Sequence, residues 1–93
     1  MDSRNTDVKA DPPDADLMMR CQKGDEAAFR ELIIRHQDAL LNFFRRLGVH
    51  TDADAEDLAQ ETLVRVYRFR DRYKPTAKFT TFLYVVARRI WID

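Results

Sequence analysis

One long amphipathic segment, from Asp25 to Gly48, constrains the fold of this chain more than any other feature. Apolar side chains recur along it at steps of three and four residues, the period of one face of an α-helix. Asp25 is a suitable N-cap and Gly48 a suitable stop. With His36, the apolar stripe consists of Phe29, Leu32, Ile33, Leu40, Phe43, Phe44 and Leu47. A stripe this wide predicts a core helix that packs on more than one neighbour.

The rest of the chain predicts three more helices. No segment alternates polar and apolar residues as a strand does. A short helix, a longer one that ends near residue 73, and a last one after a loop at residues 74–78 are expected. The residues suited to begin them are Asp14 as a cap, Thr51 or Asp52, and Thr80 or Thr81. We therefore expect an all-α fold, a compact bundle of about four helices.

The composition fits one small domain preceded by a tail. The chain has 93 residues, 45% of them hydrophobic, with two Gly and three Pro. Residues 1–13 lack apolar periodicity and end in two prolines, so we expect a disordered tail before a domain at residues 14–93. Cys21 is the single cysteine, which excludes an internal disulfide and favours a cytoplasmic location. No apolar run approaches the roughly 20 residues of a membrane span, so no membrane insertion is expected.

No residue set is typical of a catalytic, metal or cofactor site. Neither glycine belongs to a phosphate-binding loop, and the helical carboxylates lack a Glu-x-x-His partner. His36 falls within the apolar stripe, which favours a packed histidine because metal sites need several convergent ligands. We expect a binding protein that is not an enzyme and that needs no cofactor or metal.

Charge is separated along the chain, although sixteen basic and sixteen acidic residues cancel overall. Residues 1–64 carry fourteen Asp and Glu against eight Lys and Arg, whereas residues 65–93 carry two against eight. This polarity suggests two contacts, one that tolerates negative charge and one that seeks it. Chance clustering on solvated faces is the alternative.

The helix expected to start near residue 52 has one outward strip of interest, formed by Asp57, Gln60, Glu61 and Val64. These side chains lie about one helical turn apart and can reach a single partner surface. A mixed acidic, amide and apolar strip suits docking on a basic helix, but a solvated polar face explains it equally well. The opposite, core-facing side is expected to hold Ala55, Leu58, Ala59, Thr62, Val66, Phe69 and Tyr73.

A second candidate surface combines cations with aromatic and hydroxyl side chains. Cations neutralise phosphates, and rings can stack on unpaired bases. Tyr73 and Phe79 bracket a loop that carries Lys74 and Lys78, which could form a groove for an extruded base. Both rings also fall on core-facing positions, so closing the core is their alternative role. The whole set is Arg65, Arg68, Arg70, Arg72, Tyr73, Lys74, Lys78, Phe79, Thr80, Thr81, Tyr84, Arg88 and Arg89.

Three segments resemble a known family, in its order and spacing. Residues 54–67, DAEDLAQETLVRVY, look like region 2.2 of bacterial sigma factors of the extracytoplasmic-function (ECF) class. Residues 24–32, GDEAAFREL, resemble region 2.1, and residues 79–88, FTTFLYVVAR, resemble regions 2.3 and 2.4. Because the three matches are in register, residues 14–93 are identified as a sigma factor region 2 domain.

The resemblance implies a noncatalytic transcription initiation domain. The region 2.2 face, with Asp57, Gln60 and Glu61, would bind the clamp helices of the RNA polymerase beta-prime subunit. The loop and last helix would recognise and melt the promoter minus-ten element by capturing a flipped base of the non-template strand. By position, the base would meet Tyr73, Lys74, Lys78, Phe79 and Thr80, and the duplex would meet Tyr84, Arg88 and Arg89. The family also suggests an anti-sigma factor as a partner.

Two residues depart from the family pattern. Phe82 stands where Trp is usual, and Arg89 stands where Asn is usual. Arg pairs with phosphate or guanine where Asn would read adenine, so the promoter preference stays open. The sequence also ends at Asp93, before the region 4 helix-turn-helix of the family, so we expect one domain of a longer protein. The alternative function is a sigma-like helical adaptor that binds proteins but no DNA.

Overall fold

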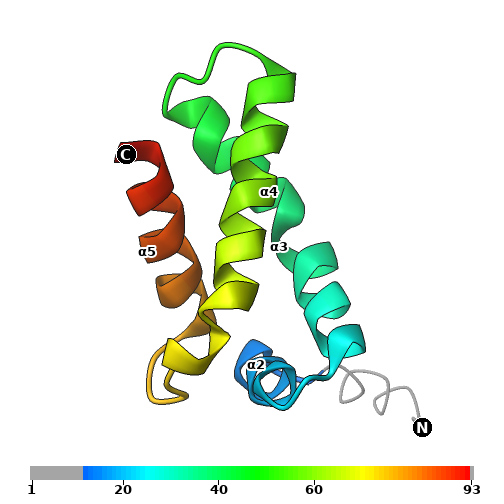
Figure 1. Ribbon diagram of the computed structural model, residues 1–93. Helices are drawn as coiled ribbons and strands as arrows, with labels where there is room; N and C mark the ends of the chain where they lie inside the picture. The colour runs from blue at the N-terminus through cyan, green and yellow to red at the C-terminus, as the bar shows by residue number, and fades with distance from the viewer. Residues whose placement is uncertain (1–11, 93) are drawn as a thin grey trace, which may run out of the picture.

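The computed structural model describes residues 12–92, which form an all-helical domain without a strand (Figure 1). The elements are α2 (Asp14–Gln22), α3 (Glu26–Arg46), α4 (Asp52–Arg68), the 3₁₀ turn η1 (Arg70–Arg72) and α5 (Phe79–Ile92). The predicted all-α bundle of four helices is therefore confirmed. Apart from its two prolines, the tail predicted at residues 1–13 lies outside the described residues. None of the described helices is long and apolar enough to cross a membrane.

Capping side chains and glycines set the main helix boundaries. The Asp25 carboxylate accepts a hydrogen bond from the Ala28 amide at 3.1 Å, and the Thr51 hydroxyl accepts one from the Asp54 amide at 3.1 Å. Gly24 and Gly48 follow α2 and α3 with φ near 95°, a left-handed conformation that glycine adopts without strain. The predicted start and end of α3, and the predicted start of α4, are confirmed.

The prediction that Asp14 caps α2 was wrong. The N-cap is Pro13, and Asp14 is the first helical residue. Its carboxylate instead binds two side chains of α3, Arg35 Nη1 at 3.1 Å and His36 Nε2 at 2.9 Å. Asp14 therefore fastens α2 to α3. The prediction of a packed histidine is confirmed, since the His36 side chain is only 14% exposed.

The segment between α4 and α5 departs from the predicted continuous helix. The α-helix ends at Arg68, and the chain tightens into η1 before it becomes extended at Tyr73. This turn directs the Tyr73 ring into the core, where it is 2% exposed. The last helix begins at Phe79, one or two residues before the expected start at Thr80 or Thr81.

The core lies where α4 packs on both α3 and α5, while α2 crosses one end of the bundle and contacts α3, η1 and α5 (Figure 1). Thr62 is the buried polar residue of this core, and its hydroxyl donates to the Leu58 carbonyl at 2.7 Å. It therefore leaves no unpaired donor. The largest fully buried side chains are Phe44, Met18, Leu32, Leu40 and Leu83.

Candidate functional site

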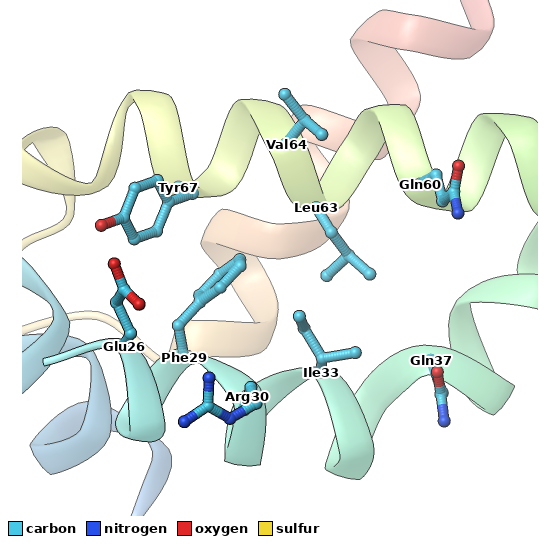
Figure 2. Close-up of a pocket in the computed structure, with 9 residues that line it drawn as sticks. All are labelled: Glu26, Phe29, Arg30, Ile33, Gln37, Gln60, Leu63, Val64 and Tyr67. Carbon is cyan, nitrogen blue, oxygen red and sulfur yellow. The ribbon is translucent and has the colours of Figure 1, made fainter.

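An apolar groove of about 610 Å³ runs between α3 and α4 (Figure 2). Phe29 and Ile33 of α3 face Leu63 and Tyr67 of α4 across it. The rings of Phe29 and Tyr67 lie 4.9 Å apart. All four side chains are only partly buried, so the apolar stripe of α3 reaches the surface here. We call this feature the α3–α4 groove.

Polar side chains form the rim of the α3–α4 groove. Gln60 and Val64 of the predicted strip lie on its α4 side, and Val64 is 49% exposed. Glu26, Arg30 and Gln37 line the α3 side. The α3 wall of the groove was not predicted from the sequence, because Phe29 and Ile33 have the spacing of core residues. An apolar stripe too wide for one neighbour was the signal that could have found them.

The predicted strip is divided by the fold. Asp57 does not line the α3–α4 groove and instead borders a smaller hollow with Leu58 and Trp91. Glu61 is held by Arg65, whose Nε donates to the carboxylate at 3.0 Å. Only Gln60 and Val64 of the four predicted residues therefore line the groove itself.

A second groove, of about 390 Å³, lies between α4 and α5 and is basic. Three arginines reach it, Arg65 and Arg72 from the α4 side and Arg89 from α5. Phe69 also lines it, and the Arg72 guanidinium stacks on the Phe69 ring with 4.5 Å to the centroid. We call this feature the α4–α5 groove. Its other lining residues are Phe82, Val85 and Val86.

Most of the predicted nucleic-acid residues are exposed around this groove and the loop beside it. The exposed cations are Arg68, Arg72, Lys74, Lys78, Arg88 and Arg89. Thr81 is also exposed, and Thr80 is half-buried. These cations come from α4, η1, the loop and α5, and two of them, Arg72 and Arg89, line the α4–α5 groove.

Tyr73 and Phe79 do not present their faces to solvent. They are 2% and 3% exposed, and their rings pack edge to face with centroids 6.2 Å apart. The Tyr73 hydroxyl donates to the Ala77 carbonyl at 2.7 Å, and burial raises the pKa of this phenol. The structure thus gives both rings the alternative role of closing the core beneath the loop at residues 74–78.

Tyr84 and Arg70, which belong to the second candidate surface, are both engaged by other parts of the protein. Tyr84 is half-buried on the α3 side of α5, with its ring 5.0 Å from that of Phe43, and this burial raises its pKa. Arg70 donates to the Cys21 carbonyl at 3.0 Å and to the Tyr67 carbonyl at 2.9 Å. Tyr84 is therefore held by packing against Phe43, and the Arg70 guanidinium is held by two backbone carbonyls.

Metal chemistry finds no support in residues 12–92, which hold no cluster of three or more His, Cys, Asp or Glu side chains suited to a metal ion. The Cys21 thiol is buried in the core, and the loss of solvent raises its pKa. A thiol in this state is a poor nucleophile.

The sigma-70 region 2 family model matches residues 32–93. The chain belongs to this family. The match includes most of α3 and all of α4, η1 and α5, so both grooves fall largely within the sigma region 2 domain.

Curated relatives of the domain are sigma factors. The sigma-H factor of Pseudomonas aeruginosa is 35% identical over 74 residues, 80% of this chain and 38% of the relative. The ECF sigma factor SigW of Bacillus subtilis is 38% identical over 77% of this chain and 38% of the relative. The ECF sigma-E factor of Escherichia coli K12 is 34% identical over 76% and 36%. The resemblance to the ECF class is confirmed, and the chain spans little more than a third of the length of these relatives.

A solved structure has the same arrangement of helices. The NMR structure of an engineered region 2 of sigmaE in complex with GTAAAA superimposes with a TM-score of 0.78 at 31% sequence identity. The superposition covers 97% of this chain and 85% of the other. It therefore includes α2, which precedes the residues matched by the family model.

Proposed function

We propose that this sigma region 2 domain is a noncatalytic transcription initiation module that works in the cytoplasm with two partners. The α3–α4 groove binds the clamp helices of the RNA polymerase beta-prime subunit. The exposed cations of the α4–α5 groove and the loop hold the non-template strand of the promoter minus-ten element. The observation that carries the proposal is that α4 has an apolar groove toward α3 and a basic groove toward α5.

The polymerase contact would depend on burial of apolar surface. Phe29, Leu63 and Val64 offer exposed apolar area of the kind that interfaces cover. Gln60 on the rim can hydrogen-bond to the partner helix, and Glu61 and Asp57 add negative charge that suits a basic partner. An anti-sigma factor that blocks initiation would have to cover the same groove or the basic surface.

The DNA contact would depend on charge. The exposed cations neutralise phosphates and release counterions, which supplies affinity without sequence preference. A flipped base would lie on the loop at residues 74–78, against Lys74, Lys78 and Thr80, with Tyr73 and Phe79 as the support beneath. Extrusion costs a few kcal/mol, which several phosphate contacts can offset, so melting needs binding energy and no catalysis. The solved complex of an engineered region 2 of sigmaE with GTAAAA supports a nucleic-acid contact for this domain.

The test measures both contacts on the same protein. Fluorescence anisotropy with a labelled GTAAAA oligonucleotide, at stated salt, reports the DNA contact, and calorimetry with a clamp-helix fragment of beta-prime reports the polymerase contact. An Arg88→Ala, Arg89→Ala variant is expected to lower the DNA affinity, while Arg20→Ala, a change at an exposed arginine of α2, is the matched control. A Gln60→Ala, Glu61→Ala variant is expected to lower the polymerase affinity.

The outcomes separate the proposed function from its rival. Salt-sensitive binding of the oligonucleotide, lost in the double arginine variant, supports the initiation module. Clamp-helix binding with no oligonucleotide binding at low salt would favour the protein-interaction adaptor. Unchanged clamp-helix affinity after the change at Gln60 and Glu61 would overturn the docking assignment.

A further inference from the structure

Gln22, the last residue of α2, joins two segments that are far apart in sequence. Its side-chain amide nitrogen donates to the Arg70 carbonyl at 2.8 Å and to the Tyr73 carbonyl at 2.9 Å. These two carbonyls stand at the beginning of η1 and just after its end. One half-buried side chain therefore clamps the turn where α4 gives way to the loop.

Arg70 returns a contact from η1 to the end of α2. Its Nε donates to the Cys21 carbonyl at 3.0 Å, and its guanidinium lies over the Tyr67 ring, 4.1 Å from the centroid. The Cys21 carbonyl also accepts from the Gly24 amide at 2.9 Å, so Arg70 adds a second hydrogen bond to this carbonyl. The end of α2 and the turn are thus bonded in both directions.

The loop beyond this turn is fixed at its ends and exposed in its middle. Tyr73 is buried, and its hydroxyl holds the Ala77 carbonyl at 2.7 Å. The Ala77 amide also donates to the Lys74 carbonyl at 3.0 Å. All five residues of the loop, 74–78, are exposed. Burial of these five residues therefore does not hold the loop, whose shape depends on its internal hydrogen bond and on the contacts at Gln22 and Tyr73.

We propose that Gln22 is a positioning residue for nucleic-acid binding, which holds the loop at residues 74–78 in the conformation that receives the DNA strand. The inference rests on the proposed function. A loop already held in its bound conformation loses less conformational entropy when it binds, so its affinity is higher. Gln22 acts through the carbonyls of Arg70 and Tyr73 and touches no DNA itself.

The experiment compares two glutamine variants on the two contacts. Gln22→Ala is expected to weaken binding of the GTAAAA oligonucleotide about tenfold, the size expected when about 1.4 kcal/mol is lost, and to leave clamp-helix affinity unchanged. Gln60→Ala, the same change on the rim of the α3–α4 groove, is expected to do the reverse. Hydrogen exchange of the Tyr73 and Ala77 amides, which donate to the Arg70 and Lys74 carbonyls, should be faster in Gln22→Ala and unchanged in Gln60→Ala.

Each result decides one claim. If unmodified protein binds the oligonucleotide and Gln22→Ala binds it equally well, the inference about Gln22 is overturned and the proposed function stands. If the unmodified protein does not bind it, the proposed function itself fails. An equal loss of both affinities in Gln22→Ala would assign Gln22 to general stability and would overturn the inference.

A second variant covers the case in which Gln22→Ala does not fold. Tyr73→Phe keeps the buried ring and removes the hydroxyl that holds the Ala77 carbonyl. It loosens the other end of the same loop, so faster exchange of the Ala77 amide with weaker oligonucleotide binding is expected. Faster exchange with unchanged binding would show that loop order does not govern affinity, and would overturn the inference.

Discussion

The two grooves beside α4 differ in how they can attract a partner. The α3–α4 groove exposes apolar side chains such as Phe29 and Val64, with few charges at its rim. The α4–α5 groove is lined by three arginines, and the loop that connects η1 to α5 carries two more exposed cations. Burial of apolar surface is short in range and insensitive to salt, whereas attraction of phosphates is long in range and screened.

This difference teaches that net charge was the wrong summary for this molecule. Opposite charges cancel over the chain, yet the fold lines the α4–α5 groove with three arginines and leaves apolar area in the α3–α4 groove. If each groove binds the partner proposed for it, the domain can hold both at once, because the grooves lie on different sides of α4. The following predictions test whether the two surfaces are separate.

A change in salt concentration should produce the largest difference between the two binding affinities. Raising the salt from 50 to 200 mM is expected to weaken oligonucleotide binding about 50-fold if about four phosphates are neutralised. Clamp-helix binding should change only a few-fold, because apolar burial dominates it. Anisotropy and calorimetry over a salt series provide the measurement. Equal slopes for the two ligands would contradict the comparison.

A charge placed in the α3–α4 groove should have the next largest effect. Val64→Arg puts a cation on an exposed apolar position, so it should fold normally and weaken clamp-helix binding about 30-fold, as for an interface residue worth about 2 kcal/mol. Oligonucleotide affinity should not fall. Val85→Arg, which alters an exposed valine of α5, is the matched control and should spare clamp-helix binding.

Substitution of the two arginines of η1 should affect different quantities, stability for Arg70 and oligonucleotide affinity for Arg72. Arg72→Ala removes an exposed cation and should weaken oligonucleotide binding a few-fold, with a salt slope smaller by about 0.7. Arg70→Ala breaks bonds to two carbonyls and should lower the free energy of unfolding by about 1–3 kcal/mol. Urea unfolding and anisotropy distinguish them. A larger loss of stability in Arg72→Ala would reverse the assignment.

The smallest effect is expected from ionisation of the Cys21 thiol, because this residue lines neither groove. Burial raises its pKa, so the folded state holds the proton more tightly than the unfolded state. This contribution to stability is full below the ordinary thiol pKa of about 8.5 and decreases as the pH rises through the higher folded value. Thiol labelling of native protein should accordingly be slow at pH 8 and accelerate in urea. Rapid labelling without urea would show that α2 is not packed as described.

Much of the fold could be predicted because helix signals are local. The stripe of α3, the caps Asp25 and Thr51, and the stop at Gly48 each depend on a few neighbouring residues. The prediction that Asp14 caps α2 failed because its carboxylate binds Arg35 and His36, which lie on the next helix. These distant partners compete with the capping role. A pattern of residues contains no information on which distant side chain wins that competition.

The two surfaces were predicted less completely. The cations around α5 were found because charge at exposed positions is visible in sequence. The α3 wall of the α3–α4 groove was missed because Phe29 and Ile33 have the spacing of core residues, and only the packing shows that the core does not cover them. The sequence alone does not distinguish Arg70 from the exposed cations, because its partners are the backbone carbonyls of Cys21 and Tyr67.

The ion pair between Glu61 and Arg65 joins the two sides of α4. Its acid belongs to the strip assigned to polymerase and its base to the groove assigned to DNA. Both sit on one helix of 17 residues, about 26 Å long, which packs against α3 and α5. Under the proposed function, the contact that orients α4 on the polymerase would therefore also orient the bound promoter strand. The position at which transcription starts would then depend on the orientation of one rigid helix, α4, that both partners share.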